Sequence, residues 1–184
     1  MAYNPDIHHR RSNRLAGYDY SQGGVYFITI CTDNKECLFG EIVNGHMMMN
    51  NLGKIVADEW IKTGTKRDNI NLDDWVVMPN HFHGIVIIDN DMEQYPSVGA
   101  QRAVPLSGRF GCLVAGSLST IIRSFKSAVT KQTNIIRQTP KLPLWQRNYW
   151  DHVVRDEADL NRIREYIHTN PQRWELDSLH RESK

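Results

Sequence analysis

Two apolar, β-branched runs flanking the dipeptide Pro79-Asn80 constrain the fold of this chain more than any other feature. Residues 70–78 and 81–88 are rich in Val and Ile, and a Pro-Asn pair between such runs is typical of a turn. A third run of this kind covers residues 25–31. The dipeptide Asn44-Gly45 between further apolar residues is a strong hairpin signal. The sequence therefore predicts several strands, most of them early in the chain.

Helical patterns lie between and after these strands. Asn50 or Asn51 can cap a helix over about residues 51–63 that Gly64 closes. A basic helix is expected from about residue 119 to 132, and a last helix from Asp156 to about residue 169, before Pro171. Strands that are separated by one helix and followed by further helices indicate an α+β fold with a mainly antiparallel sheet.

The length of the chain, 184 residues, fits one domain spanning residues 1–184. Residues 1–22 are expected to be an irregular N-terminal arm, and residues 89–118 a long loop without periodicity. We see neither a signal peptide nor an apolar run long enough to cross a membrane. Three cysteines without a CxxC spacing argue against a disulfide framework, and a cytoplasmic protein with reduced thiols is the simplest interpretation.

Charge is segregated along the chain, although the net charge is only +1. Residues 94–150 contain no Asp or Glu, and a second basic cluster lies in the N-terminal arm. Segregation of this kind suits a positive face for phosphates, while a solvated basic surface is the plain alternative. The candidate phosphate-binding residues are Arg10, Arg11, Arg14, Arg123, Lys126, Lys131, Arg147 and Arg162.

His81 and His83 are the first candidates for chemistry. In a strand, residues two apart share a face, so both imidazoles point the same way while Phe82 points to the other side. Imidazole binds several divalent metals, which makes the pair a plausible clamp. Alone it is a weak signal, because strand histidines are structural or merely exposed about as often as they are ligands.

The last helix offers possible partners for the two histidines. Arg162, Tyr166 and Asn170 are four residues apart and form one stripe beside an apolar stripe. Tyr166 at the border of the buried face could present its hydroxyl to the sheet, and Asn170 could supply an oxygen ligand. From the residues alone, a tyrosine with its ring in the core is the better interpretation of Tyr166.

Several motifs together resemble the REP-associated tyrosine transposases, which are relatives of the single-strand insertion-sequence transposases in the HUH nuclease superfamily. The resemblance covers most of the chain except the loop 89–118. The matching blocks are residues 18–21, 24–32, 75–85, 145–147, 149–152 and 165–171.

The resemblance implies a ferredoxin-like antiparallel sheet with helices packed on it. It also implies Tyr166 as the nucleophile on a C-terminal helix, and His81, His83 and Asn170 as ligands of Mg²⁺ or Mn²⁺. The implied reaction is cleavage and rejoining of single-stranded DNA at or near hairpins through a 5′-phosphotyrosine. Family members work as monomers or as homodimers, and the sequence does not decide between them.

Other interpretations remain open at this stage. A DNA-hairpin-binding protein descended from such a transposase would bind without cutting. A metal-dependent hydrolase of small molecules would use the same histidines but leave the basic stretch unexplained. His152 is a candidate base or a structural histidine, and Trp145, Tyr149 and Trp150 are either base-stacking or core aromatics.

Overall fold

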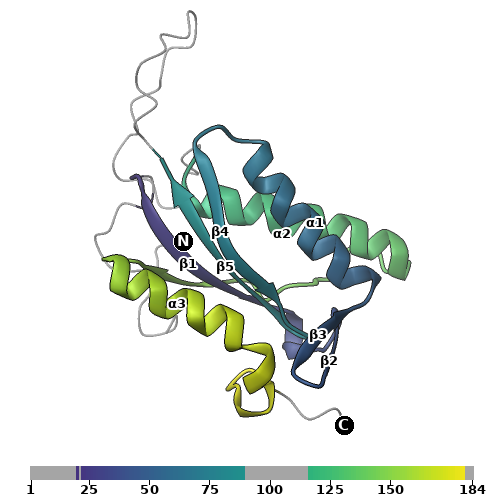
Figure 1. Cartoon of the computed structure of the whole chain (residues 1–184). Coiled ribbons are helices and arrows are strands. Elements are labelled where there is room, and N and C mark those ends of the chain that lie inside the picture. Colours follow the sequence, from purple (N-terminus) through teal and green to yellow (C-terminus); the bar gives the residue numbers. More distant parts are fainter. Residues whose placement is uncertain (1–19, 21, 90–115, 181–184) are drawn as a thin grey trace, which may run out of the picture.

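The centre of the structure is a four-stranded antiparallel sheet in the order β4-β5-β1-β6 (Figure 1). The computed structural model describes residues 20, 22–89 and 116–180. Most of the expected N-terminal arm and of the loop 89–118, including Arg10, Arg11 and Arg14, lies outside the described residues. The strands of the sheet are β1 (Gly24–Cys31), β4 (Ile70–Val77), β5 (His81–Ile88) and β6 (Trp150–Val153).

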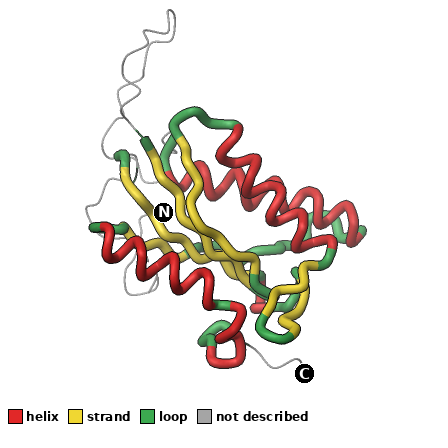
Figure 2. The backbone as a smooth tube through the Cα atoms, viewed as in Figure 1, coloured by secondary structure: helices red, strands yellow, loops and turns green. Residues whose placement is uncertain are grey.

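Helices cover both faces of this sheet, as the tube in Figure 2 also shows. Helices α1 (Asn51–Thr65) and α2 (Leu118–Arg137) pack on one face, and α3 (Glu157–Thr169) packs on the other. Apart from α3 and the hairpin β2 (Gly40–Val43) and β3 (His46–Met49), the chain order is β-α-β-β-α-β. This order is that of a ferredoxin-like unit, so the expected α+β fold is confirmed.

The main core lies between the sheet and the pair α1 and α2. Trp60 on α1 packs against Phe82 on β5 with ring centroids 4.7 Å apart, and against Phe125 on α2 at 5.2 Å. All three rings are buried. Gly84 on β5 makes room for the Trp60 ring, so the strand that carries the two histidines is held from behind by aromatic packing.

The helix ends follow local capping chemistry. The Asn50 side chain accepts hydrogen bonds from the Leu52 and Gly53 amides at the start of α1, and Asp156 accepts one from Asp159 at the start of α3. Helix α2 runs to Arg137, beyond the predicted end at residue 132. It continues because buried Thr133 extends the inward stripe.

Helix α3 is docked by a small apolar patch and by two polar contacts with β4. Ile163 and Ile167 pack on Ile85 of β5. On β4, Asp73 accepts a hydrogen bond from Arg164 Nε at 3.0 Å, and Asp74 pairs with His168 at 2.8 Å. These contacts fix the rotation of α3 about its axis and therefore the direction of its remaining side chains.

Beyond α3, the chain turns through the 3₁₀ helix η2 (Pro171–Leu176), whereas the 3₁₀ helix η1 (Asp33–Lys35) follows β1. Pro171 ends α3, as the sequence predicted. None of the helices in the described part of the chain is long and apolar enough to cross a membrane.

Substitution of Gly84 tests the packing behind the histidine strand. A Cβ at this position would lie 2.7 Å from Trp60 Cζ2 and 2.8 Å from Phe82 Cε1. Gly84→Ala is therefore expected to lower the free energy of unfolding by about 1–3 kcal/mol. Chemical denaturation measures the loss. Gly64→Ala is the control, because its Cβ meets only the Leu72 side chain and its helix propensity improves. Equal effects of the two substitutions would contradict this account.

Candidate active site

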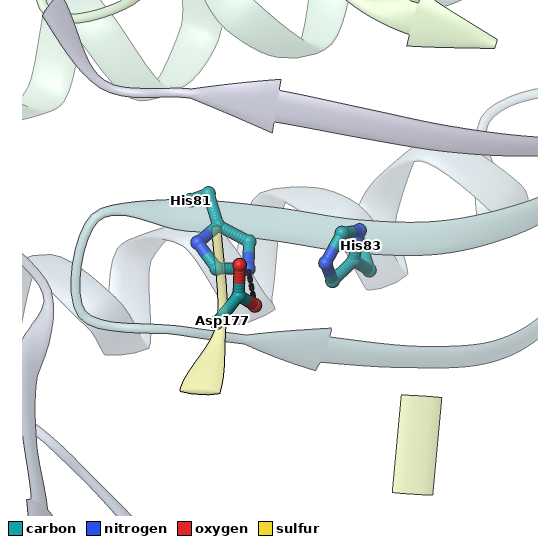
Figure 3. Close-up of side chains that lie close together, drawn as sticks. All are labelled: His81, His83 and Asp177. Atoms are coloured by element: carbon teal, nitrogen blue, oxygen red, sulfur yellow. Dashed lines mark ion pairs between the residues drawn. The ribbon is translucent and has the colours of Figure 1, made fainter. Parts of the chain in front are cut away.

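The two histidines lie side by side on the α3 face of β5. Their ring centroids are 4.5 Å apart, and both residues are buried. Phe82 between them points to the opposite face, into the main core. The structure thus confirms the shared face that the two-residue spacing predicted, and Figure 3 shows both imidazoles on the same side of the strand.

Asn80 orients the ring of His81. Its amide nitrogen donates to the carbonyl oxygens of Lys35 (3.2 Å) and Leu179 (2.8 Å), so its Oδ1 is left as the acceptor. The 2.8 Å contact between His81 Nδ1 and Asn80 Oδ1 then requires a proton on Nδ1. The lone pair of His81 Nε2 is therefore free, and this buried atom has no hydrogen-bond partner among the described residues.

His83 is held by three neighbours. Its Nδ1 lies 2.8 Å from Thr29 Oγ1 on β1, and its ring stacks on Phe27 with centroids 5.3 Å apart. Its Nε2 lies 3.3 Å from the hydroxyl oxygen of Tyr166 on α3. One chain therefore brings together the tyrosine and the histidine pair that lie far apart in the sequence.

Tyr166 stands at the edge of the site rather than in the core. It is 39% exposed, and its ring meets Phe27 and His83 edge-on at 6.0 and 5.2 Å. The core position that the residues alone favoured is thus wrong. Burial, followed by the negative charge of Asp177, raises the pKa of the Tyr166 phenol above its usual value.

Asn170 and Asp177 complete the cluster. Asn170 is buried at the end of α3, and its Nδ2 donates to Asp177 Oδ2 at 3.3 Å. Its Oδ1 is buried without a hydrogen-bond partner in the described part of the chain. Asp177 Oδ2 lies 3.8 Å from His81 Nε2, the pair that Figure 3 marks with a dashed line. Ligand atoms of His81, His83 and Asp177 all lie within 4.8 Å of one another.

Asp177 is a site residue that the sequence reasoning missed. It follows η2, outside every block of residues that carried the family resemblance. Its approach to the histidines depends on a return of the chain, in which the Asn80 amide holds the Leu179 carbonyl and Lys35 Nζ donates to the Ser178 carbonyl at 3.3 Å. Residue periodicity does not predict such a turn. The only sequence signal for Asp177 as a site residue was an acidic residue close to the last helix.

The chemistry of this cluster fits a divalent metal ion. Burial, and then the charge of Lys35, lowers the pKa of His81 to about 3. Burial, and then the charge of His81, lowers the pKa of His83 well below its usual value. Both rings are therefore neutral, as metal ligands must be. Two neutral imidazoles, the Asp177 carboxylate and the unpaired Oδ1 atom of Asn170 therefore form a set of four possible ligands for a metal ion.

The predicted phosphate-binding residues fall on two surfaces. Arg162 is exposed on α3, one turn before Tyr166, whereas Arg123, Lys126 and Lys131 belong to α2 across the sheet. Lys126 Nζ donates to the carbonyl oxygen of Gln146 at 2.6 Å, with longer contacts to the next two carbonyls. Burial lowers the pKa of Lys126 to about 8. This lysine therefore anchors the segment before β6.

His152 lies on β6 and pairs with α3. Its Nε2 is 2.7 Å from Asp159 Oδ2, and this hydrogen bond, followed by that of Arg162, lowers the pKa of Asp159 to about 2. The Asp159 carboxylate also contacts Arg162. His152 thus ties the edge strand to α3, which is a structural role and matches the plainer of its two interpretations.

Comparisons with known proteins add to this geometry. No family model matches the chain. A Haemophilus influenzae protein described as "Uncharacterized protein" is 42% identical over 179 residues, 97% of each chain. A second protein of that organism, "Putative REP-associated tyrosine transposase", is 36% identical over 176 residues, covering 90% of this chain and 85% of its own length.

A solved structure shares the fold. It is that of a REP-associated tyrosine transposase bound to a REP hairpin, with a TM-score of 0.56 and 20% identity over 86% of this chain and 74% of its own. The solved structure shows the shared fold, and the 36% identical relative places the chain in the class of transposases. More particularly, it belongs to the REP-associated tyrosine transposases, as the sequence motifs indicated.

Asn80→Ala tests whether Asn80 holds His81 and the C-terminal turn in place. The substitution leaves His81 Nδ1 and two carbonyl oxygens without their partner, so the free energy of unfolding should fall by roughly 1–3 kcal/mol. Amide hydrogen exchange at residues 177–180 should also become faster. Asn71→Ala, at an exposed position on β4, is the matched control. Unchanged exchange in the Asn80 variant would contradict the role of Asn80 in holding the C-terminal turn.

Proposed function

We propose that this protein is an endonuclease and strand transferase for single-stranded DNA that cuts at or near a hairpin. The observation that carries the proposal is the 3.3 Å contact between Tyr166 Oη and His83 Nε2. A half-exposed phenol beside a buried pair of neutral imidazoles is open to a substrate on one side and backed by metal-binding groups on the other. The named relatives support the same class of activity.

The proposed chemistry uses Tyr166 as the nucleophile. Its phenol oxygen attacks the phosphorus of the scissile phosphodiester and loses its proton. The bond from phosphorus to the 3′ oxygen breaks, and that oxygen takes up a proton and leaves as a free 3′ hydroxyl. The new phosphotyrosine keeps the 5′ phosphate activated, so a later 3′ hydroxyl can reverse the step and join new ends.

The cluster around β5 would hold the metal ion. His81 and His83 would bind through Nε2, Asp177 through its carboxylate and Asn170 through Oδ1. A bound Mg²⁺ or Mn²⁺ ion supplies Lewis-acid stabilisation of the charge that develops on the phosphate. The chain's own part is orientation. Asn80 and Thr29 fix the two imidazoles, and the apolar patch with the polar contacts between α3 and β4 fixes Tyr166.

Hairpin DNA is the proposed partner. The structurally similar transposase is bound to a REP hairpin, and this chain has a surface that suits duplex phosphates. A shallow groove of about 450 Å³ runs between α2 and the segment before β6, with Lys131 and Arg147 exposed on its walls. Positive groups on such a groove would bind the DNA backbone without reading its sequence.

Tyr166→Phe tests the nucleophile. The variant should form no covalent protein–DNA adduct, because it lacks the attacking oxygen, while binding of the same DNA stays within about 2-fold. The assay uses labelled single-stranded hairpins from beside the gene with Mn²⁺, and denaturing gels resolve the adduct. Tyr26→Phe, in the core on the opposite face of the sheet, is the control for loss of a tyrosine hydroxyl and should still form the adduct. An adduct with Tyr166→Phe would refute the assignment, and hairpin binding without any adduct from the unaltered protein would indicate a non-cutting binding protein.

Single substitutions test the metal site. His81→Ala and Asp177→Ala should each weaken Mn²⁺ binding by at least about 10-fold, since even outer-shell partners contribute that much to metal affinity. Titration calorimetry measures the affinity without DNA. The yield of the covalent protein–DNA adduct should fall together with the affinity for Mn²⁺. Asp58→Asn, on the exposed face of α1, is the control for loss of an acidic group. If Asp177→Ala binds Mn²⁺ as tightly as the unaltered protein, the third ligand is misassigned.

A further inference from the structure

We propose that Trp150 is a stacking platform that holds an unpaired base of the DNA strand beside the cleavage site. This inference rests on the function proposed above and assigns a positioning role to a residue on the edge strand β6. Three observations carry it, namely the face on which Trp150 lies, its exposure, and the way its strand is anchored.

Strand pairing places Trp150 on the face of the sheet that bears the candidate active site. Thr29 on β1 pairs with His83 on one side and with Trp150 on the other. The Thr29 side chain contacts His83, and directly opposed residues in antiparallel strands share a face. Trp150 therefore points to the same side as His83, two strand spacings or about 10 Å away along the sheet.

Exposure distinguishes Trp150 from the other tryptophans. It is 60% exposed, while Trp60, Trp145 and Trp174 are buried and Trp75 is half-buried. Of the sequence's candidate stacking residues, Trp145 is thus part of the core. A large exposed indole at a sheet edge is a costly position for solubility and packing, and it suits a partner that has a flat aromatic face.

The strand that carries Trp150 is anchored to its two neighbours, β1 and α3. His152, which lies two residues after Trp150 on β6, pairs with Phe27 of β1. The His152 side chain makes a hydrogen bond with Asp159 of α3. The same carboxylate contacts Arg162, so the edge strand, α3 and an exposed guanidinium are joined close to the platform. A base stacked on Trp150 would gain from a surface already ordered in the free protein.

The surrounding charge favours nucleic acid over an apolar partner. Arg147 precedes the platform and lines the groove beside α2, and exposed Arg155 and Arg162 follow it on the α3 side. The segment from Arg147 to Trp150 therefore links the groove proposed for the hairpin to the face with Tyr166. Positive groups that track the backbone, with an aromatic ring for the bases, are the features of a single-strand binding surface.

Abasic scanning tests the inference. The probe is a DNA hairpin from beside the gene with an unpaired extension, made as a series with one abasic nucleotide at successive positions. Proteins carry Tyr166→Phe so that no cleavage disturbs the binding measurement. With Trp150 intact, one abasic position should weaken binding on the order of 10-fold. With Trp150→Ala, binding of the intact probe should be weaker by a similar factor, and that abasic position should cause no further loss.

Two further variants complete the experiment. Trp150→Phe should restore most of the affinity, because it keeps an aromatic face, and Ile135→Ala on α2 is the control for removal of an exposed apolar side chain. Abasic effects that persist in Trp150→Ala would overturn the platform. So would unchanged DNA binding accompanied by a shift in oligomeric state, since Trp150 would then serve a protein contact. If either of these two results is found and the protein with Trp150 still forms the covalent adduct, only the stacking role of Trp150 is refuted and the proposed nuclease activity is not. If the protein binds no DNA at all, both proposals are refuted.

Discussion

Burial of two imidazole rings on the inner strand β5 is the constraint on which the rest of this structure depends. A buried polar ring is costly unless its nitrogens have partners. Neighbouring elements meet this requirement on one nitrogen of each ring, through Asn80 before the strand and Thr29 on β1. The other nitrogen of each ring faces a common point near Asp177 and Tyr166. The satisfied nitrogens hold the rings in place, and the remaining ones are available for chemistry.

The two faces of the sheet are packed in different ways. The face covered by α1 and α2 carries the large aromatic core around Trp60, which stabilises the strands irrespective of any ligand. The face covered by α3 has only a small apolar patch around Ile85, so polar contacts such as Arg164 with Asp73 must help to dock the helix. Tyr166 at the border of this small patch stays partly exposed, so its hydroxyl is open to a ligand from solvent.

The C-terminal turn makes the candidate metal site more than a pair of histidines. Residues after α3 return over β5, and Trp174 packs 5.9 Å from His81 while Asp177 approaches the free nitrogen of that ring. Asn170 lies where α3 ends and touches Asp177. The end of the tyrosine helix and the turn that follows it thus form one unit with the histidine strand. Movement of α3 would therefore shift Tyr166, the proposed nucleophile, and the candidate ligands together.

Local patterns in the sequence determined much of this protein. Alternation put His81 and His83 on one face, Asn50 and Asp156 marked helix starts, and the motif around Tyr166 indicated the family. These features depend on neighbours in the chain, which the sequence shows directly. Only the tertiary structure decided that Asp177 joins the histidines, that Lys126 is occupied by backbone carbonyls, and that Trp150 is exposed while Trp145 is buried. Each of these outcomes depends on segments far apart in the chain, and residue spacing carries no information about where such segments meet.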